Sequence, residues 1–211
     1  MPKVKICGIS SPEHMVVAAA AGADYLGLVF APSRRQVTVD QAQYLVQTLR
    51  EAGYATPVVG LFVNASADAI TTVVRTCGLD VVQLHGNEPY ALCANIPNVP
   101  IWRAVRLTGS DDETEWLATH DERVTLLVDA PVAGAFGGTG ERADWQAATA
   151  LARQRRVVLA GGLNPQNVQT ALAQVQPWAV DVSSGVERDG HKDNGLIAAF
   201  VALAKDAPKE A

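Results

Sequence analysis

The chain has 211 residues, of which 48% are hydrophobic and 18% are charged, and its formal net charge is −5. This composition is typical of one compact globular domain and excludes a disordered chain. The acidic balance, with no basic run longer than Arg34-Arg35 or Arg155-Arg156, argues against a nucleic-acid partner. No apolar run reaches the roughly 18 residues of a membrane helix, so we expect no membrane association.

The cysteines and histidines predict no metal or disulfide. Cys7, Cys77 and Cys93 form no C-x-x-C pair, and the 4 histidines have no metal-ligand spacing. A strand-like run begins almost at the N-terminus and leaves no room for a signal peptide. We therefore expect a reduced, cytoplasmic protein without metal or cofactor.

Short apolar runs recur along the whole chain. They cover residues 4–7, 25–30, 58–62, 81–84, 101–104, 125–128, 157–160 and 179–182. None alternates cleanly between apolar and polar residues, which is typical of parallel strands buried on both faces.

Stretches with helical spacing lie between these runs, over residues 12–21, 39–52, 66–76, 111–119, 165–173 and 193–204. Ser11 followed by Pro12 predicts a capped helix start, and Asn164 followed by Pro165 repeats the pattern. Thr38 is the expected cap of the second helix, which we expect to stop at Gly53. The stretch 111–119 is the least regular of the set.

Strand–helix units of roughly 20 to 33 residues, eight in number, predict a single-domain (β/α)8 barrel over residues 1–204, with 205–211 as a polar C-terminal tail. The chain is shorter than the usual ~250 residues, so the connections must be minimal. A doubly wound open sheet is the structural alternative. The count of eight and the lack of a G-x-G-x-x-G after the first strand disfavour it.

The active site of such a barrel lies at the carboxyl ends of its strands. Polar or glycine residues follow nearly every predicted strand there: Cys7, Arg35, Asn64, Gln83, His85, Arg103, Arg106, Asp129, Gly161, Gly162, Asp181, Ser183, Ser184 and Gly185. We expect these residues to surround one pocket.

Cys7 and Asp129 are the candidate base and acid. A functional cysteine must be a thiolate, and Lys5, two residues away on the same side of the strand, is a possible stabilising cation. The alternative is that Cys7 is a small apolar filler. Asp129 ends an apolar strand, so burial is expected to raise its pKa and keep it protonated as a general acid. A carboxylate that accepts backbone N–H groups is the alternative.

Glycine-rich loops follow the last two strands, at Gly161-Gly162 and Ser183-Ser184-Gly185. Barrels commonly hold a phosphate on backbone N–H groups at these two positions, although ordinary turns would have similar composition. The long segment 130–142, which contains Gly138 and Thr139, is a candidate lid. Arg35 is a candidate for pairing with a substrate carboxylate, with Arg34 facing solvent, and the residues alone leave the two interchangeable.

These motifs together resemble phosphoribosylanthranilate isomerase of tryptophan biosynthesis. The matching motifs, from residue 3 to residue 193, are K-I-C-G-I-S from Lys5, V-Q-L-H-G from Val82, G-G-T-G from Gly137 with Asp144-Trp145, L-A-G-G-L-N-P from Leu159, and D-V-S-S-G-V-E from Asp181. The departures, at Ala143 and at Asp189-Gly190-His191, touch loop packing rather than the chemistry.

The resemblance implies the fold, the reaction and the residue roles. Cys7 would be the general base, Asp129 the general acid and Arg35 the anthranilate-carboxylate ligand. The phosphate would lie on Gly161, Gly162, Ser183, Ser184 and Gly185. Lys5, Gln83, His85, Gly138, Thr139 and Asp181 are expected to line the rest of the pocket.

The implied reaction is the Amadori rearrangement of N-(5-phosphoribosyl)anthranilate to 1-(2-carboxyphenylamino)-1-deoxyribulose 5-phosphate, which needs no cofactor. The alternatives are a related aminoaldose isomerase of histidine biosynthesis and a non-catalytic phosphosugar-binding barrel. The former places an aspartate where this chain has Cys7, and the latter would have no use for Cys7 and Asp129 together. A monomer and a homodimer are both compatible with the sequence.

Overall fold

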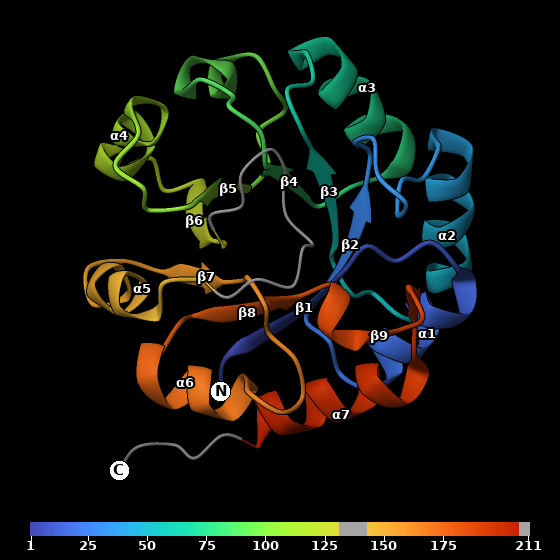
Figure 1. The fold of residues 1–211 in the computed structure, drawn as a ribbon. Helices are drawn as coiled ribbons and strands as arrows, with labels where there is room; N and C mark the ends of the chain where they lie inside the picture. The colour runs from blue at the N-terminus through green and yellow to red at the C-terminus, as the bar shows by residue number, and fades with distance from the viewer. Residues whose placement is uncertain (131–142, 207–211) are drawn as a thin grey trace.

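The chain folds into a closed barrel of eight parallel strands, seen in a computed structural model that describes residues 1–130 and 143–206 (Figure 1). The strands are β1 Lys3–Cys7, β2 Tyr25–Val29, β3 Val58–Phe62, β4 Val81–Leu84, β5 Ile101–Val105, β6 Val124–Val128, β7 Val157–Leu159 and β8 Ala179–Val182. Each strand pairs with the next in the sequence, and β8 pairs with β1 to close the barrel. The predicted (β/α)8 barrel is confirmed.

Helices form an outer ring around the strands (Figure 1). They are α1 Pro12–Ala20, α2 Val39–Glu51, α3 Ala67–Cys77, α4 Asp111–Ala118, α5 Trp145–Ala152, α6 Val168–Val175 and α7 Asn194–Lys205. After β8 come a 3-10 helix, η2 Ser184–Val186, and the short antiparallel pair β9 Glu187–Arg188 and β10 His191–Lys192. Within the described ranges, no helix combines the length and apolarity needed to cross a bilayer.

The predicted caps of the first helices are confirmed. Ser11 accepts a hydrogen bond from the His14 N–H, and Pro12 occupies the first turn of α1. Thr38 and Gln41 form a reciprocal capping box at the start of α2. Both devices satisfy backbone donors that have no partner within the helix, so local sequence suffices to place these starts.

The predicted helix start at Pro165 is wrong. The side-chain oxygen of Asn164 accepts from the N–H groups of Gln166 and Asn167, at 2.9 and 3.1 Å, and so closes a local turn. The helix α6 begins only at Val168, after Asn167. Asn side chains favour such turns by bonding the backbone that follows them. The Asn-Pro pair therefore shapes the loop after β7 instead of opening the helix.

The connection between β4 and β5 also differs from a full strand–helix unit. It contains the 3-10 helix η1, Tyr90–Ala94, in place of an α-helix. Pro89 precedes this turn, and Pro97 and Pro100 follow it. Proline lacks a backbone N–H and restricts the residue before it, so the segment cannot extend into a regular helix. The short connection helps to explain how the barrel closes with few residues.

Aromatic rings fill the lower interior of the barrel. The ring of Trp102 lies 4.8 Å from that of Tyr25 and 6.0 Å from that of Trp178, measured between centroids. Lys5 points inward above them, with Nζ 5.7 Å from the centroid of Trp102. Cys7, two residues further along β1, faces the same way because side chains alternate along a strand. Aromatic and apolar side chains thus fill the barrel interior beneath Lys5.

Arg103 does not face the pocket, contrary to prediction. Its neighbour Trp102 points inward, so Arg103 points outward from β5 and lies fully buried under the helix layer. Its guanidinium donates to Glu88, at 2.6 Å, and lies 5.1 Å from the ring centroid of Trp116. This ion pair fastens the segment after β4 to the barrel wall.

The last helix, α7, ends beside the start of the first strand. The helix α7 continues to Lys205, whose ammonium group forms an ion pair with Asp24. Asp24 also pairs with Lys3 at the start of β1. Lys205 therefore belongs to the folded helix, and residues 207–211 of the expected tail lie outside the described residues.

Candidate active site

A buried ion pair joins β1 to β8 inside the barrel. Lys5 Nζ donates to Asp181 Oδ2 at 2.8 Å and to Gln83 Oε1 on β4 at 2.7 Å. Lys5 and Gln83 are completely buried, and Asp181 is 7% exposed. Among the described residues, the other oxygen of Asp181, Oδ1, has no hydrogen-bond partner. An unpaired buried carboxylate oxygen is an acceptor available to a ligand hydroxyl.

The hydrogen-bond chain continues from Gln83 to Asp129. Gln83 Nε2 lies 2.9 Å from His85 Nδ1, and His85 Nε2 lies 3.0 Å from Asp129 Oδ2. Asp129 Oδ1 accepts the N–H of Ala130 at 2.8 Å. Barrel closure thus brings residues from β1, β4, β6 and β8 into one connected network. Of the predicted pocket residues, it contains Lys5, Gln83, His85, Asp129 and Asp181.

The predicted upward shift of the Asp129 pKa is wrong for the ligand-free protein. Burial, the largest influence, raises the pKa, but the hydrogen bond from His85, the charge that His85 carries when protonated, the hydrogen bond from Ala130 and the charge of Arg106 together outweigh it. The net result is a pKa below the ordinary 3.8 of an aspartate. Donors to the charged form of a carboxyl group favour ionisation. Asp129 is therefore a carboxylate before a ligand enters.

Cys7 lies at the end of β1 with its side chain buried. A Cβ atom added to Gly27 on β2 would lie 2.9 Å from Cys7 Sγ and 2.9 Å from Lys5 Cε, so only glycine leaves room for both side chains. Burial raises the pKa of the Cys7 thiol above its ordinary 9.0; the cations of Lys5 and Lys192 oppose this rise, and the Asp181 carboxylate adds to it. The thiol is protonated at rest but stands beside positive charge that stabilises a thiolate.

Arg35 is held beside the end of β1 by Glu187. Its Nε and Nη2 donate to the two carboxylate oxygens of Glu187, at 2.6 and 3.0 Å. A Cβ on Gly8, whose φ is +74°, would lie 2.5 Å from Arg35 Cδ. Glycine at this position therefore lets the Arg35 side chain pass over the β1 loop. Arg34 also pairs with Glu187 but is exposed, so of the two arginines Arg35 is the one packed at the pocket.

Lys192 is a buried cation that sequence reasoning gave no role. Its Nζ donates to Ser183 O at 2.8 Å and to Glu187 at 3.0 Å. Ser183 in turn donates from Oγ to the Cys7 carbonyl oxygen at 3.2 Å. Lys192 and Glu187 thereby connect the loop after β8 with Arg35 and with the end of β1. Both residues lie in the matched motif region, but nothing local showed that they form an ion pair.

The two glycine loops lie against each other. A Cβ on Gly185 would lie only 1.8 Å from the carbonyl oxygen of Leu163, in the loop after β7. Gly161 and Gly162 have φ values of +74° and +65°, in the region that favours glycine. A Cβ on Gly161 would lie 2.7 Å from the Ala130 backbone nitrogen. The loops after β6, β7 and β8 are therefore packed backbone to backbone, and Ser184 opens η2 at their meeting point.

Two predicted residues, Gly138 and Thr139, lie outside the described residues, as does the candidate lid that contains them.

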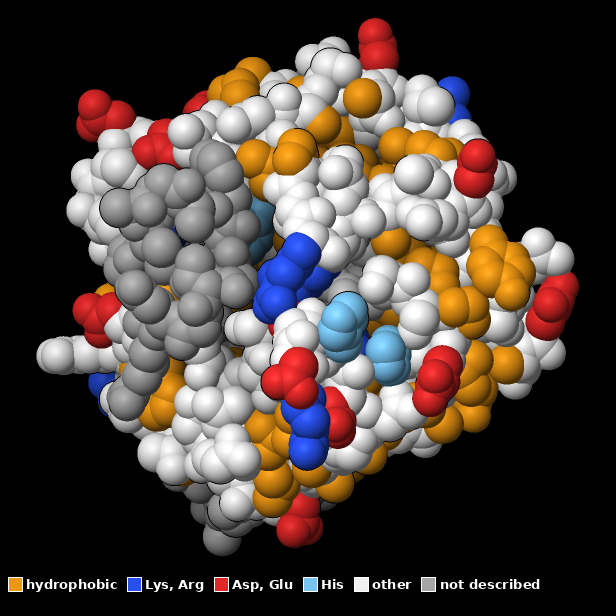
Figure 2. Space-filling model, turned by 45° about the vertical axis from the view of Figure 1, so that its right-hand side comes forward, with side chains coloured by type: hydrophobic (Ala, Val, Ile, Leu, Met, Phe, Trp, Pro, Cys, Tyr) orange, Lys and Arg blue, Asp and Glu red, His pale blue; other side chains and the backbone are white. Residues whose placement is uncertain are grey.

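Figure 2 shows one face of the molecule, on which basic side chains stand beside acidic ones and histidines near the middle of the view. In the described ranges, no group of three or more histidine, cysteine or acidic side chains is placed to hold a metal ion.

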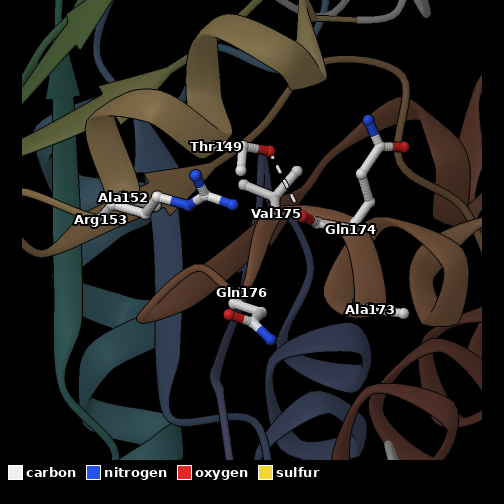
Figure 3. Close-up of a pocket in the computed structure, with 7 residues that line it drawn as sticks. All are labelled: Thr149, Ala152, Arg153, Ala173, Gln174, Val175 and Gln176. Carbon is white, nitrogen blue, oxygen red and sulfur yellow. Dashed lines mark hydrogen bonds between the residues drawn. The ribbon is translucent and has the colours of Figure 1, made fainter.

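A separate cavity of about 250 Å³ lies far from this network, between α5 and α6 (Figure 3). Thr149, Arg153 and Gln176 are among its lining residues. The lining residues lie in the C-terminal halves of these helices or directly after them, toward the starts of β7 and β8, and so toward the opposite end of the barrel from the strand carboxyl ends. None of the predicted site residues lines this cavity.

A closed (β/α)8 barrel with a buried polar network near its strand ends and glycine loops after its last two strands is the arrangement typical of barrel enzymes that act on phosphorylated substrates. Comparison with known protein families identifies the particular family within this class. The family described as N-(5'-phosphoribosyl)anthranilate (PRA) isomerase matches residues 4–203. This chain belongs to that family.

Individual relatives agree with this assignment. The N-(5'-phosphoribosyl)anthranilate isomerase of Roseiflexus castenholzii is 47% identical, over 98% of this chain and 99% of its own length. The crystal structure of phosphoribosyl anthranilate isomerase from Thermotoga maritima is 36% identical, with a TM-score of 0.84 over 97% of this chain and 99% of that one. A related crystal structure, 35% identical with a TM-score of 0.81 over 97% of this chain and 99% of that one, contains reduced 1-(o-carboxyphenylamino)-1-deoxyribulose 5-phosphate.

Proposed function

We propose that this chain isomerises N-(5'-phosphoribosyl)anthranilate by general acid–base catalysis, with Asp129 as the acid and Cys7 as the base. Family membership over nearly the whole chain supports the assignment of this reaction, an Amadori rearrangement in tryptophan biosynthesis. The residue roles are supported by the burial of both side chains and by their place at the network described above, because Asp129 is bonded to His85 and the Cys7 thiol lies beside Lys5.

Asp129 protonates the ring oxygen of the substrate, and the furanose opens to a Schiff base. In the ligand-free protein this carboxyl is ionised, so it must take up a proton with the substrate. Burial is the largest influence on its pKa and favours the protonated form. A substrate that displaces the remaining water strengthens this influence and moves Asp129 toward the acid form.

Cys7 then removes the proton from the second carbon of the sugar, and the enolamine tautomerises to the ketone. The thiolate it needs is favoured by Lys5 and Lys192, whose positive charges oppose the rise that burial gives the pKa of Cys7. Hydrogen moves between neighbouring carbons without net oxidation, so side chains suffice for the chemistry and no cofactor is needed.

The substrate's two anionic ends have separate partners in this proposal. Arg35 holds the anthranilate carboxylate, because a guanidinium is suited to two-pronged contacts with carboxylates. Gly161, Gly162, Ser183, Ser184 and Gly185 hold the phosphate on the two loops that pack together. The open acceptor, Asp181 Oδ1, is placed to take a ribose hydroxyl.

The decisive experiment follows the disappearance of phosphoribosylanthranilate fluorescence, with the substrate generated in situ. We expect turnover by the wild type and a loss of about 10²–10⁴-fold in kcat for Cys7→Ser and for Asp129→Asn. Cys93→Ser is the matched control, because Cys93 is also buried but lies in η1, outside the barrel mouth. Near-wild-type kcat in either site variant would contradict that residue's role, and an inactive wild type would contradict the function.

We further propose a cytoplasmic location, which suits a biosynthetic enzyme, and an assembly that is either a monomer or a homodimer. One related structure from Thermotoga maritima is described as monomers generated from a dimeric enzyme, so both states are compatible with this fold. Light scattering of the purified protein across a range of concentrations decides between them, and fractionation of expressing cells tests the location.

A further inference from the structure

The Lys5–Gln83 contact fixes the orientation of the Gln83 side chain. An ammonium group can only donate hydrogen bonds, so the Gln83 atom that faces Lys5 must be the amide oxygen. The amide nitrogen then faces His85 and can only donate. All three side chains are buried, so no exchange with bulk water relaxes this arrangement.

The orientation of Gln83 in turn fixes the proton on His85. Because His85 Nδ1 accepts from the Gln83 amide, it carries no proton. The single ring proton lies on Nε2, which donates to Asp129 Oδ2. A doubly protonated ring would point an N–H at the Gln83 NH₂ group. Turning the amide to avoid this would place that NH₂ group against the Lys5 ammonium instead.

We propose that Gln83 is a positioning residue that keeps His85 neutral and so leaves Asp129 free to act as the acid. An imidazolium beside Asp129 would hold the carboxylate ionised, because an adjacent positive charge favours the charged form. A neutral imidazole supplies a hydrogen bond without that charge. The proposal rests on the acid role of Asp129 proposed above.

Few other charged groups lie near His85 and Asp129. Among the described residues, Arg106 after β5 acts on Asp129 through its charge, and Lys5 on β1 and Asp181 on β8 lie beyond Gln83. Lys5 and Asp181 pair with each other, which limits their effect on His85. His85 is therefore the side chain in direct contact with the acid whose charge Gln83 can influence.

The first test reads the tautomer directly in the ligand-free protein. Nitrogen-15 NMR of the imidazole rings at pH 7 distinguishes protonated from unprotonated ring nitrogens, and the spectrum of His85→Gln identifies the His85 signals. We expect Nε2 protonated and Nδ1 unprotonated in the wild type, and both protonated in Gln83→Glu, whose carboxylate accepts from Nδ1. A wild-type ring protonated on Nδ1 would overturn the proposal.

The second test uses activity. Gln83→Glu keeps the shape of the side chain but favours the imidazolium, so we expect kcat to fall about 10²-fold, the lower range for losing an acid catalyst. Because the acid must be protonated, the decline of kcat with rising pH should move to lower pH. Loss of packing alone would lower kcat without moving the profile, and that result would contradict the proposal.

A double variant isolates the charge. In Gln83→Glu/His85→Gln, the new amide at position 85 can still donate to Asp129 but can never become a cation, so kcat should recover about 10-fold relative to Gln83→Glu. The effect of the introduced carboxylate on Lys5 and Cys7 persists in the double variant, so recovery reports the imidazolium alone. No recovery would overturn the proposal. Wild-type turnover tests the enzyme's function separately, and the tautomer measurement does not depend on it.

Discussion

Lys5 and Asp181 form a buried ion pair, 2.8 Å long, across the seam at which β1 and β8 close the barrel. The pair lies between the aromatic floor of the barrel and Cys7, and Gln83 shares the same ammonium group. It therefore links the closure of the fold to the charge distribution in the pocket.

Lys5→Met should destabilise the protein by about 3–5 kcal/mol, because it leaves the Asp181 carboxylate buried without its cation. Lys5→Met/Asp181→Leu should lose less, since apolar replacement of both partners removes the unpaired charge, although Gln83 still lacks its donor. Urea unfolding at pH 7, followed by circular dichroism, measures both. Equal destabilisation of the single and double variants would show that the ion pair is not the cause.

Glu187→Gln should weaken substrate binding more than catalysis. It removes the carboxylate that orients the Arg35 guanidinium in a two-pronged contact, so KM should rise about 10-fold, with a smaller change in kcat. Arg34→Gln is the control. Arg34 pairs with the same carboxylate but is exposed, and exposed pairs contribute about 0–1 kcal/mol. A similar KM in Glu187→Gln and wild type would contradict the orienting role.

Glu187 should also give the protein an acid-sensitive stability. Burial raises its pKa, but the hydrogen bonds and charges of Arg35 and Lys192 outweigh burial and hold it below the ordinary 4.5. A carboxyl group with a lowered pKa stabilises the folded state above its unfolded pKa and loses this effect as pH falls. The stability difference between wild type and Glu187→Gln should therefore shrink as pH falls below about 4.5, which urea unfolding at a series of pH values measures.

Gly185→Ala should disturb the two glycine loops, after β7 and after β8, together. The new Cβ would meet the Leu163 carbonyl oxygen at 1.8 Å, so the loops after β7 and β8 must separate. We expect a loss of about 1–3 kcal/mol in stability and a raised KM. Gly53→Ala is the control: its φ of +86° strains an alanine locally after α2, but nothing lies within 4 Å of the new Cβ, so KM should not change. An unchanged KM in Gly185→Ala would show that the contact between these two loops does not affect substrate binding.

Cys93 should make the protein less stable in alkaline solution. Burial raises the pKa of its thiol to about 11, from an ordinary 9.0. The unfolded chain then ionises at lower pH than the folded one, so stability present below pH 9 is lost as pH rises toward 11. Unfolding free energies of wild type and Cys93→Ala, measured from pH 8 to 11, should show the shallower decline in the variant. Parallel declines would exclude Cys93 as the source.

The sequence predicted the parts of this protein that depend on near neighbours. The eight strands, the caps at Ser11 and Thr38 and the barrel itself follow from short-range hydrophobic patterns and side-chain-to-backbone bonds. The motifs were specific enough to identify the family, because they appear in order over nearly the whole chain. The same local reasoning failed at Asn164-Pro165, where two local signals compete and the turn prevails over the helix cap.

The tertiary structure alone decided the electrostatics of the site. Lys5 and Asp181 are 176 positions apart, and His85 and Asp129 are 44 apart, so only barrel closure brings them into contact. For this reason the sequence suggested a raised pKa for Asp129 from its apolar strand, whereas the donors around it produce a lowered one. Arg103 was misplaced for a related reason, because which face of β5 points inward depends on its register with the neighbouring strands.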